Sequence, residues 1–252
     1  MKRALLNHLG RPVWGEVRED DAIVVLPDGA RIGFEDADWL PPATAGATIF
    51  ALGLNYADHV KELGFKAKEP PLIFLKGPNT LIGHGQATPR PADANQMHPE
   101  CELVAVIGRP ARRVRAADAL DHVASYTVAN DYAIREYLEN YYRPNLRVKN
   151  RDTTTPLGPW LVDAADIADP QALDLTTRVN GELVQPGSTA DMILGVADLI
   201  AYLSETMTLL PGDMILTGTP QGVHFCNVGD VVECEIAGVG RLINRIAPDL
   251  LP

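Results

Sequence analysis

The chain has 252 residues, of which 46% are hydrophobic and 22% are charged, as is ordinary for a globular protein that buries a sizeable core. Its formal net charge of −11 at pH 7 argues against nucleic acids and anionic membrane surfaces as partners. The three cysteines form no C-x-x-C pattern, and no apolar run approaches the length of a membrane span. We therefore expect a soluble, cytoplasmic protein with reduced thiols that binds neither nucleic acid nor membrane.

The first 43 residues predict a small N-terminal β unit. Residues 22–26 have the apolar pattern of a strand, and Pro27-Asp-Gly29 is typical of a turn. Pro41-Pro42 then begins a linker. We expect a unit over residues 1–43 and a main domain over residues 48–252.

Short strands dominate the expected main domain, with a few helices between them. The expected strands cover residues 48–52, 72–76, 102–108, 124–131, 214–217 and 231–236, and the expected helices cover 56–63, 116–123, 134–142 and 191–209. The last helix is indicated by an apolar stripe at helical spacing. This pattern predicts an α+β fold that is mainly β, with a mainly antiparallel or mixed sheet system. No G-x-G-x-x-G or Walker A pattern is present, so we do not expect a nucleotide site.

Two glutamates lie one residue apart at the head of the third strand. Alternate residues of a strand share a face, so Glu100 and Glu102 project the same way, while Cys101 faces the other side. Like charges this close repel unless a cation lies between them. Asp131 ends the next strand and offers a third carboxylate, and such ligands suit Mg²⁺ or Mn²⁺. The alternative is a polar strand edge with solvated acids.

A second constellation lies in the helix expected over residues 56–63. His59 and Glu62 are spaced i and i+3, which places them on one helix face. A carboxylate beside an imidazole can orient it as a general base. The alternative is a surface helix with an ordinary solvated histidine.

Five basic residues lie within 17 positions of this acidic chain: Arg135, Arg143, Arg147, Lys149 and Arg151. Arginine binds carboxylates bidentately, so the stretch indicates a pocket for a substrate with several carboxylates. Lys76 can add a further contact. The alternative is a solvated basic face.

The strand over residues 214–217 runs into Thr217-Gly-Thr219-Pro220. Glycine at position 218 lets the backbone approach a ligand closely. The backbone N–H groups and the Thr219 hydroxyl are suited to gripping a carboxylate. The alternative is an ordinary tight turn.

Together these segments resemble the fumarylacetoacetate hydrolase family. In the order of that family they are Gly53–His59, Phe74–Pro78, Glu100–Leu103, Asn130–Asp131, Lys149 and Leu216–Pro220, and they cover about residues 48–246. The resemblance implies a mixed-sheet fold like the C-terminal domain of that family and a homodimer. It implies a Mg²⁺ or Mn²⁺ ion held by Glu100, Glu102 and Asp131. It also implies that His59, Glu62 and Lys149 are catalytic.

Residues 130–152 and 155–160 are similar to one branch of this family. That branch decarboxylates 5-oxopent-3-ene-1,2,5-tricarboxylate and isomerises 2-hydroxyhepta-2,4-diene-1,7-dioate in 4-hydroxyphenylacetate breakdown. For this oxo-tricarboxylate the expected substrate contacts are Lys76, Arg135, Arg143, Arg147 and Thr219. Some members carry two family halves in one chain, whereas this sequence has one. The resemblance therefore leaves open whether both activities reside here or a second family subunit is needed.

Two other classes of function remain to be weighed. An acylpyruvate or fumarylpyruvate hydrolase, or an oxaloacetate decarboxylase, would use the same acids and need fewer cationic contacts. A non-catalytic binding protein on the same scaffold is disfavoured, because Glu100, Glu102, Asp131 and His59 are all present.

Overall fold

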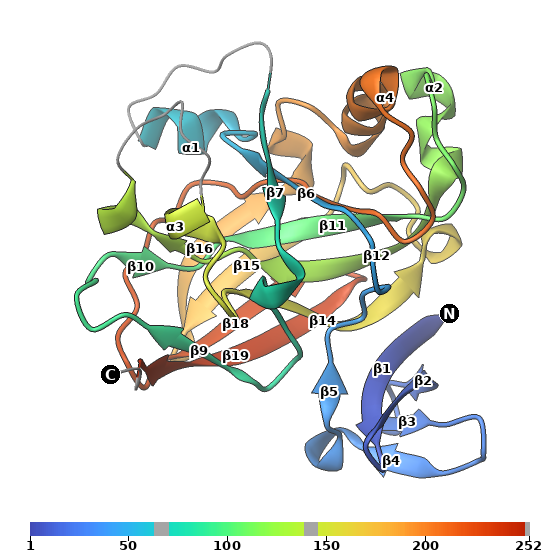
Figure 1. Ribbon diagram of the computed structural model, residues 1–252, viewed down its shortest axis with the longest axis vertical. Coiled ribbons are helices and arrows are strands. Elements are labelled where there is room, and N and C mark those ends of the chain that lie inside the picture. Colours follow the sequence, from blue (N-terminus) through green and yellow to red (C-terminus); the bar gives the residue numbers. More distant parts are fainter. Residues whose placement is uncertain (63–70, 139–145, 250–252) are drawn as a thin grey trace.

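The structure, a computed structural model, describes residues 1–62, 71–138 and 146–249. Strands dominate it and the helices are few and mostly short, which confirms the expected α+β, mainly β class (Figure 1). Parallel pairs occur beside many antiparallel ones, so the sheets are mixed as expected.

The larger sheet carries the acidic residues of interest. In spatial order its strands are β4 (Arg31–Gly33), β3 (Ile23–Val25), β2 (Arg11–Arg18), β1 (Lys2–His8), β14 (Thr155–Asp163), β12 (Val123–Asn130), β11 (Cys101–Ile107), β17 (Met214–Leu216), β6 (Ile49–Gly53) and β7 (Leu72–Lys76), with β5 (Trp39–Leu40) beside β1 and β8 (Leu81–Ile82) beside β14. Strand β11 therefore lies in the interior of the sheet, between β12 and β17.

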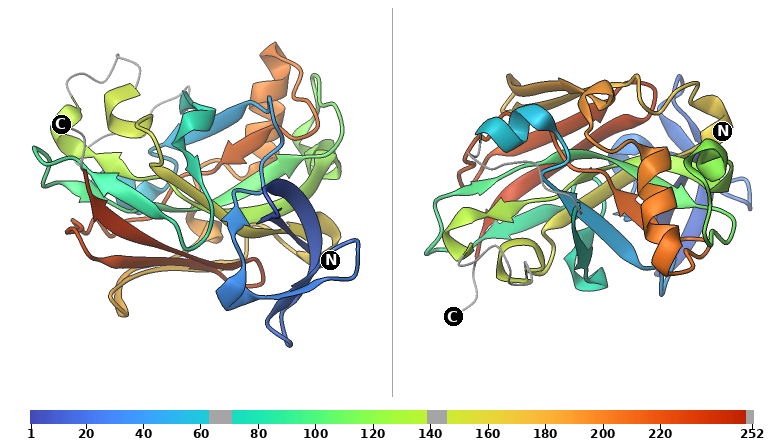
Figure 2. Two further views of the ribbon diagram at one scale, coloured as in Figure 1. Left: turned by 60° about the horizontal axis from the view of Figure 1, so that its bottom comes forward. Right: turned by 90° about the horizontal axis from the view of Figure 1, so that it is seen from above.

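A smaller sheet packs under the middle of the larger one. In spatial order its strands are β16 (Glu182–Ser188), β15 (Asp174–Val179), β18 (Val231–Ile236), β19 (Gly240–Pro248) and β9 (Ala87–Arg90). Strands β15, β18 and β19 contact β11, β12 and β14, and the left view of Figure 2 shows the two layers from the side. A separate two-stranded ladder joins β10 (Met97–His98) to β13 (Ala133–Ile134).

The helices gather at two ends of the larger sheet (Figure 1). The α-helices are α1 (Ala57–Glu62), α2 (Ala116–Ala119), α3 (Leu146–Lys149) and α4 (Val196–Thr206), and the 3₁₀ turns are η1 (Phe34–Asp36), η2 (Pro78–Thr80), η3 (Leu120–His122), η4 (Arg135–Tyr137), η5 (Ala164–Asp166) and η6 (Thr189–Asp191). Helices α2 and α4 pack together at one end, and α1 and α3 lie at the other. Among the described residues, no helix is both long and apolar enough to span a bilayer.

Two helix predictions need correction. The helix expected over residues 134–142 is wrong for its described part, because Ile134 pairs with Met97 in β13 and η4 makes only a single turn after it. The helix expected over residues 191–209 is shorter, since α4 begins at Val196 after Gly195 as its N-cap. In both places tertiary pairing or a cap residue overrides the apolar periodicity.

The alternation of β11 explains why the acids share a face. Odd-numbered residues of Cys101–Ile107 point into the main core between the two sheets. Val104 and Val106 point the opposite way, into a smaller apolar cluster with β6, β14 and β17. Glu100 and Glu102 continue this second series, so their carboxylates lie on the side of the smaller cluster.

The N-terminal strands β1–β5 join the main sheet through two residue pairs, Lys2 with Val162 and Arg3 with Leu161. A cleft of about 890 Å³ lies where this unit meets the rest of the chain, and Trp39, Trp160 and His84 are among its lining residues. The three carboxylates are not among the residues that line this cleft. The cleft is therefore separate from the candidate site described next.

Candidate metal centre

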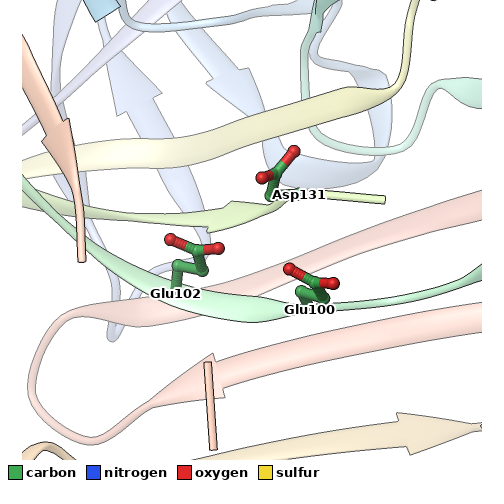
Figure 3. Close-up of side chains that lie close together, drawn as sticks. All are labelled: Glu100, Glu102 and Asp131. Atoms are coloured by element: carbon green, nitrogen blue, oxygen red, sulfur yellow. The ribbon is translucent and has the colours of Figure 1, made fainter. Parts of the chain in front are cut away.

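Three carboxylates converge at the ends of β11 and β12 (Figure 3). Ligand oxygens of Glu100, Glu102 and Asp131 all lie within 4.8 Å of one another, and all three residues are buried. Asp131 directly follows β12, and its backbone N–H donates to the carbonyl of Glu100 at 2.9 Å. The main-chain ladder thus fixes the spacing between the two strands' ligands.

Two carboxylate oxygens in this cluster are buried without a hydrogen-bond donor: Glu102 Oε1 and Asp131 Oδ2. Lys149 Nζ lies 3.0 Å from Asp131 Oδ2, but not in hydrogen-bonding geometry. A buried carboxylate oxygen that accepts no hydrogen bond is costly. A divalent cation that takes oxygen ligands would satisfy both atoms, so the residues fit such an ion.

Two buried lysines, Lys149 and Lys76, contact the acids. Lys149 Nζ lies 2.6 Å from Glu100 Oε2 and 2.8 Å from the Asp131 carbonyl. Burial pulls the pKa of Lys149 down, but Asp131 and the two glutamates outweigh it and raise the pKa above its ordinary value. Lys76 Nζ lies 2.6 Å from Asp131 Oδ1 and also donates to the Lys149 carbonyl, and burial lowers the pKa of Lys76.

The two glutamates hold their protons very differently. Burial opposes ionisation of Glu100, but the Lys149 ammonium outweighs it and lowers the pKa of Glu100 to about 2. Burial, followed by the charges of Asp131 and Glu100, raises the pKa of Glu102 well above its usual range. Glu100 therefore ionises more readily than an ordinary glutamate, whereas Glu102 resists ionisation.

His59 and Glu62 form a dyad on α1. His59 Nδ1 lies 3.0 Å from Glu62 Oε2, and His59 is only 4% exposed, so it is not a solvated surface histidine. Glu62 also accepts the backbone N–H groups of Gly222 and Val223 at 3.1 Å. Burial opposes this charge, but the Val223 N–H and His59 lower the pKa of Glu62. When His59 Nδ1–H donates to Glu62, its Nε2 is left free to take a proton.

One loop links the carboxylates to the dyad. The Gly218 N–H donates to Glu102 Oε2 at 2.6 Å, and Gly222 in the same loop donates to Glu62. Gly218 has φ +88°, and a Cβ there would lie 3.0 Å from Asn55 Cβ. Asn55 Nδ2 in turn donates to the Thr217 carbonyl at 2.8 Å. The loop after β17 is therefore held against the segment that leads into α1.

The expected substrate contacts are distributed unevenly. Arg135 is near the acids, with Nη2 3.7 Å from Glu100 Oε1, while Arg147 on α3 is exposed and stacks 4.7 Å over the Tyr137 ring. Lys76 lies within the cluster, but its ammonium is engaged by Asp131, so direct substrate contact by Lys76 requires that ion pair to open. The predicted contact Arg143 lies outside the described residues.

Two residues that the sequence did not single out contact the expected site residues. His98 Nε2 accepts from Arg135 Nε at 2.8 Å, and Gln185 Nε2 donates to Thr219 Oγ1 at 3.0 Å. His98 lies only two positions before Glu100, and this proximity in sequence could have indicated that it lies near the site. Gln185 is 34 positions from Thr219, and nothing in its own segment indicates the contact.

Comparison with known proteins agrees with this geometry. Residues 48–247 match the family profile described as "Fumarylacetoacetate (FAA) hydrolase C-terminal". The 4-hydroxyphenylacetate degradation bifunctional isomerase/decarboxylase of Salmonella dublin is 59% identical over 205 residues, which are 81% of this chain and 48% of that protein. The chain thus spans about half the length of that relative.

Two solved structures are also similar. The 5-carboxymethyl-2-hydroxymuconate delta-isomerase from Mycobacterium smegmatis has a TM-score of 0.86 at 36% identity and covers 99% of either chain. Fumarylpyruvate hydrolase from Pseudomonas aeruginosa, solved in complex with Mn²⁺ and pyruvate, has a TM-score of 0.76 at 29% identity over 83% of this chain and 96% of its own.

Proposed function

The chain belongs to the fumarylacetoacetate hydrolase family, and from this membership we propose that it is a metal-dependent enzyme of 4-hydroxyphenylacetate breakdown. Its reactions are decarboxylation of 5-oxopent-3-ene-1,2,5-tricarboxylate and isomerisation of 2-hydroxyhepta-2,4-diene-1,7-dioate. The observation that carries the proposal is the buried cluster of Glu100, Glu102 and Asp131. The substrate assignment is supported by the Salmonella relative, whose sequence is 59% identical.

The ion is assigned to Mg²⁺, with Mn²⁺ as the other candidate, and its ligands to the three carboxylates. When bound, it supplies positive charge that stabilises the negative charge developing on a 2-oxo acid during the reaction. Lys149 holds Glu100 and Asp131 in place for this role, since its ammonium contacts both residues. Lys76 restrains Asp131 from the other side.

Proton transfer is assigned to His59. Glu62 and the N–H groups behind it fix the imidazole, so Nε2 is the atom that removes or delivers a proton. Both proposed reactions need this step, because loss of CO₂ and migration of the double bond pass through the same dienolate. Protonation of the dienolate at its oxygen gives the hydroxydiene, and protonation at a carbon gives the unsaturated ketone.

The basic side chains are proposed to bind the remaining carboxylates of the substrate. Arg135 lies beside Glu100 of the carboxylate cluster and is only partly exposed, which suits bidentate binding of a carboxylate. Arg143, Arg147 and Lys76 are proposed as further contacts, and Thr219 as a hydroxyl donor.

A substrate panel tests the proposal. The two pathway compounds, fumarylpyruvate and oxaloacetate are each incubated with Mg²⁺ or with EDTA, and loss of the conjugated chromophore and release of CO₂ are followed. We expect turnover of the pathway compounds that EDTA abolishes. Turnover of fumarylpyruvate alone would support the hydrolase alternative, which the similarity to the Pseudomonas structure motivates. Activity unaffected by EDTA would contradict the metal assignment.

We also propose a homodimer in the cytoplasm, with a second family subunit as the alternative partner. The homodimer is the assembly that the resemblance to the fumarylacetoacetate hydrolase family implies. Light scattering of the purified chain should give twice its mass of 27.3 kDa. A monomer that becomes active only when another family member is added would favour the alternative.

A further inference from the structure

We infer that Gln185 is a positioning residue that directs the hydroxyl hydrogen of Thr219 toward the substrate. The inference rests on the proposed function, because it assumes an oxo-acid substrate beside the carboxylates. Gln185 lies on β16 in the smaller sheet and is 2% exposed, so its side chain is fully enclosed by protein.

The amide orientation of Gln185 is fixed by its neighbours. Gln185 Nε2 lies 2.8 Å from the Pro220 carbonyl, which can only accept a hydrogen bond. The NH₂ group must therefore face the loop, and Oε1 faces Thr177, whose hydroxyl donates to it at 2.7 Å. The second hydrogen of Nε2 is then directed at Thr219 Oγ1, 3.0 Å away.

This arrangement determines what the Thr219 hydroxyl can do. Because Oγ1 accepts from Gln185, the hydroxyl hydrogen must point elsewhere. Within the described part of the chain, no acceptor takes that hydrogen, although Thr219 is only 3% exposed. A buried donor without an acceptor is unfavourable, and a carboxylate or keto oxygen of a ligand would satisfy it.

Thr219 lies next to a residue that contacts the carboxylate cluster. Thr219 follows Gly218, whose N–H donates to Glu102 at 2.6 Å. Gln185 also supports the far end of the same loop, since a Cβ on Gly222 would lie 2.8 Å from Gln185 Cβ. The amide of Gln185 thus contacts Thr219 and Pro220, while its aliphatic stem packs against Gly222 in the same loop and is unchanged in a glutamate.

Gln185→Glu tests the direction of the hydrogen bond with an almost unchanged shape. A carboxylate cannot donate, so the Thr219 hydroxyl would turn back and donate to Glu at position 185. The readout is binding of pyruvate in the presence of Mn²⁺, measured by calorimetry, together with the KM and kcat for the pathway substrate. We expect pyruvate Kd and substrate KM to rise about tenfold, while the Mn²⁺ affinity and kcat change little.

A mutant cycle with Thr219→Val distinguishes positioning from general damage. Each single variant should weaken pyruvate binding about tenfold, and the double variant should be no weaker than Thr219→Val alone. Gln171→Glu is the matched control, because Gln171 Nε2 donates to the Thr189 carbonyl at 2.9 Å and its Oε1 accepts from the Val196 N–H. This control removes an equivalent donor away from the carboxylates and should bind pyruvate like the wild type.

Different outcomes test the role of Gln185 and the proposed function. Normal pyruvate binding by Gln185→Glu, or additive losses in the double variant, would overturn the role of Gln185. If Gln185→Glu does not fold, Gln185→Met, which is uncharged and of similar length, carries the same expected loss. A wild type that binds no pyruvate with Mn²⁺ would overturn the proposed function and this inference with it.

Discussion

Glu102 and Glu100 are neighbours on one strand face, yet their surroundings shift their pKa values in opposite directions. Glu100 is paired with the Lys149 ammonium, whereas Glu102 has one backbone N–H donor, from Gly218. The pKa of Glu102 is raised by burial and by the charges of Asp131 and Glu100, so in the metal-free protein its carboxyl retains a proton to higher pH than an ordinary glutamate does. A metal ion must displace that proton to use the carboxylate as a ligand.

This displacement predicts a pH-dependent metal affinity. Because the raised pKa favours the protonated form of Glu102 when no metal is bound, Mg²⁺ binding should release a proton and tighten as pH rises. Calorimetry in two buffers with different ionisation enthalpies measures the number of protons released. Binding at pH 7 without proton release would contradict the assignment of the proton to Glu102.

Removing the charge of Glu102 should abolish most of the metal affinity. Glu102→Gln keeps the shape and an acceptor for the Gly218 N–H but lacks an anionic ligand, so we expect at least about a 100-fold loss of Mn²⁺ affinity. Titration followed by electron paramagnetic resonance measures it. Glu182→Gln, at an exposed position of β16, is the control and should bind Mn²⁺ normally.

Glu62 is expected to affect turnover rather than metal binding. Its carboxylate orients His59 and contacts no metal ligand in the hydrogen bonds described. Glu62→Gln should lower kcat about 10²-fold or more with little change in Mn²⁺ affinity. Glu205→Gln on the exposed side of α4 is the control. Equal losses of kcat and metal affinity would argue that Glu62 serves only to hold the fold.

At the scale of elements, the sequence predicts best where local pattern and tertiary position agree. The alternation after Glu100 indicated the ligand face correctly, and the strands at 72–76 and 231–236 match β7 and β18. The helix expected over 134–142 is wrong for its described part, because Ile134 pairs with Met97, 37 positions away. Gln185 was missed for the same reason, since it contacts Thr219 in the loop after β17, 34 positions away in the chain.

The loop after β17 shows how much of the candidate site depends on backbone shape. Gly218→Ala should be destabilising, because φ is +88° and the new Cβ would meet Asn55 Cβ at 3.0 Å. We expect a loss of about 1–2 kcal/mol in unfolding free energy and weaker Mn²⁺ binding, because the N–H that contacts Glu102 must move.

Gly181→Ala is the matched control for this loop. Gly181 has φ +83°, and a Cβ added there would meet nothing within 4 Å, so this variant carries the backbone strain without the collision. Urea unfolding and Mn²⁺ titration of both variants separate the two effects. Equal Mn²⁺ affinities in the two alanine variants would argue that Gly218 matters only for folding.

At the scale of the whole molecule, the junction with the N-terminal strands depends on a small aromatic cluster. The rings of Trp39 and His84 lie 5.3 Å apart, and Trp39 and Trp160 lie 6.3 Å apart. His84 Nδ1 accepts the Ile243 N–H at 3.2 Å, which requires a neutral ring. The division into a unit over residues 1–43 and a domain over residues 48–252 stays a prediction. Strand β1 of the first unit pairs with β14 of the second, so the two share one sheet.

The His84 environment predicts loss of stability in acid. Burial, with a smaller contribution from Arg241, lowers the pKa of His84 from 6.5 to about 4. Between these values the unfolded chain binds a proton that the folded chain does not, so stability falls as pH drops from about 6.5 to about 4. The linked change is at most about 3 kcal/mol.

Replacing this histidine should reduce the acid dependence. Urea unfolding of His84→Gln, followed by tryptophan fluorescence, is expected to show a flatter pH profile than the wild type from about pH 6.5 to about pH 4. His8→Gln, on the N-terminal hairpin, is the control and should keep the wild-type profile. A profile for His84→Gln that is as steep as the wild type would assign the acid sensitivity to other groups.

Beside its ion pairs, the candidate centre has several main-chain contacts: the N–H of Gly218 on Glu102, those of Gly222 and Val223 on Glu62, and that of Asp131 on the Glu100 carbonyl. Such groups persist whatever side chain a position carries, provided the chain path is kept. Substitutions around the substrate can therefore accumulate without dismantling the reactive core. A scaffold of this kind can acquire new substrates over evolutionary time while its chemistry stays the same.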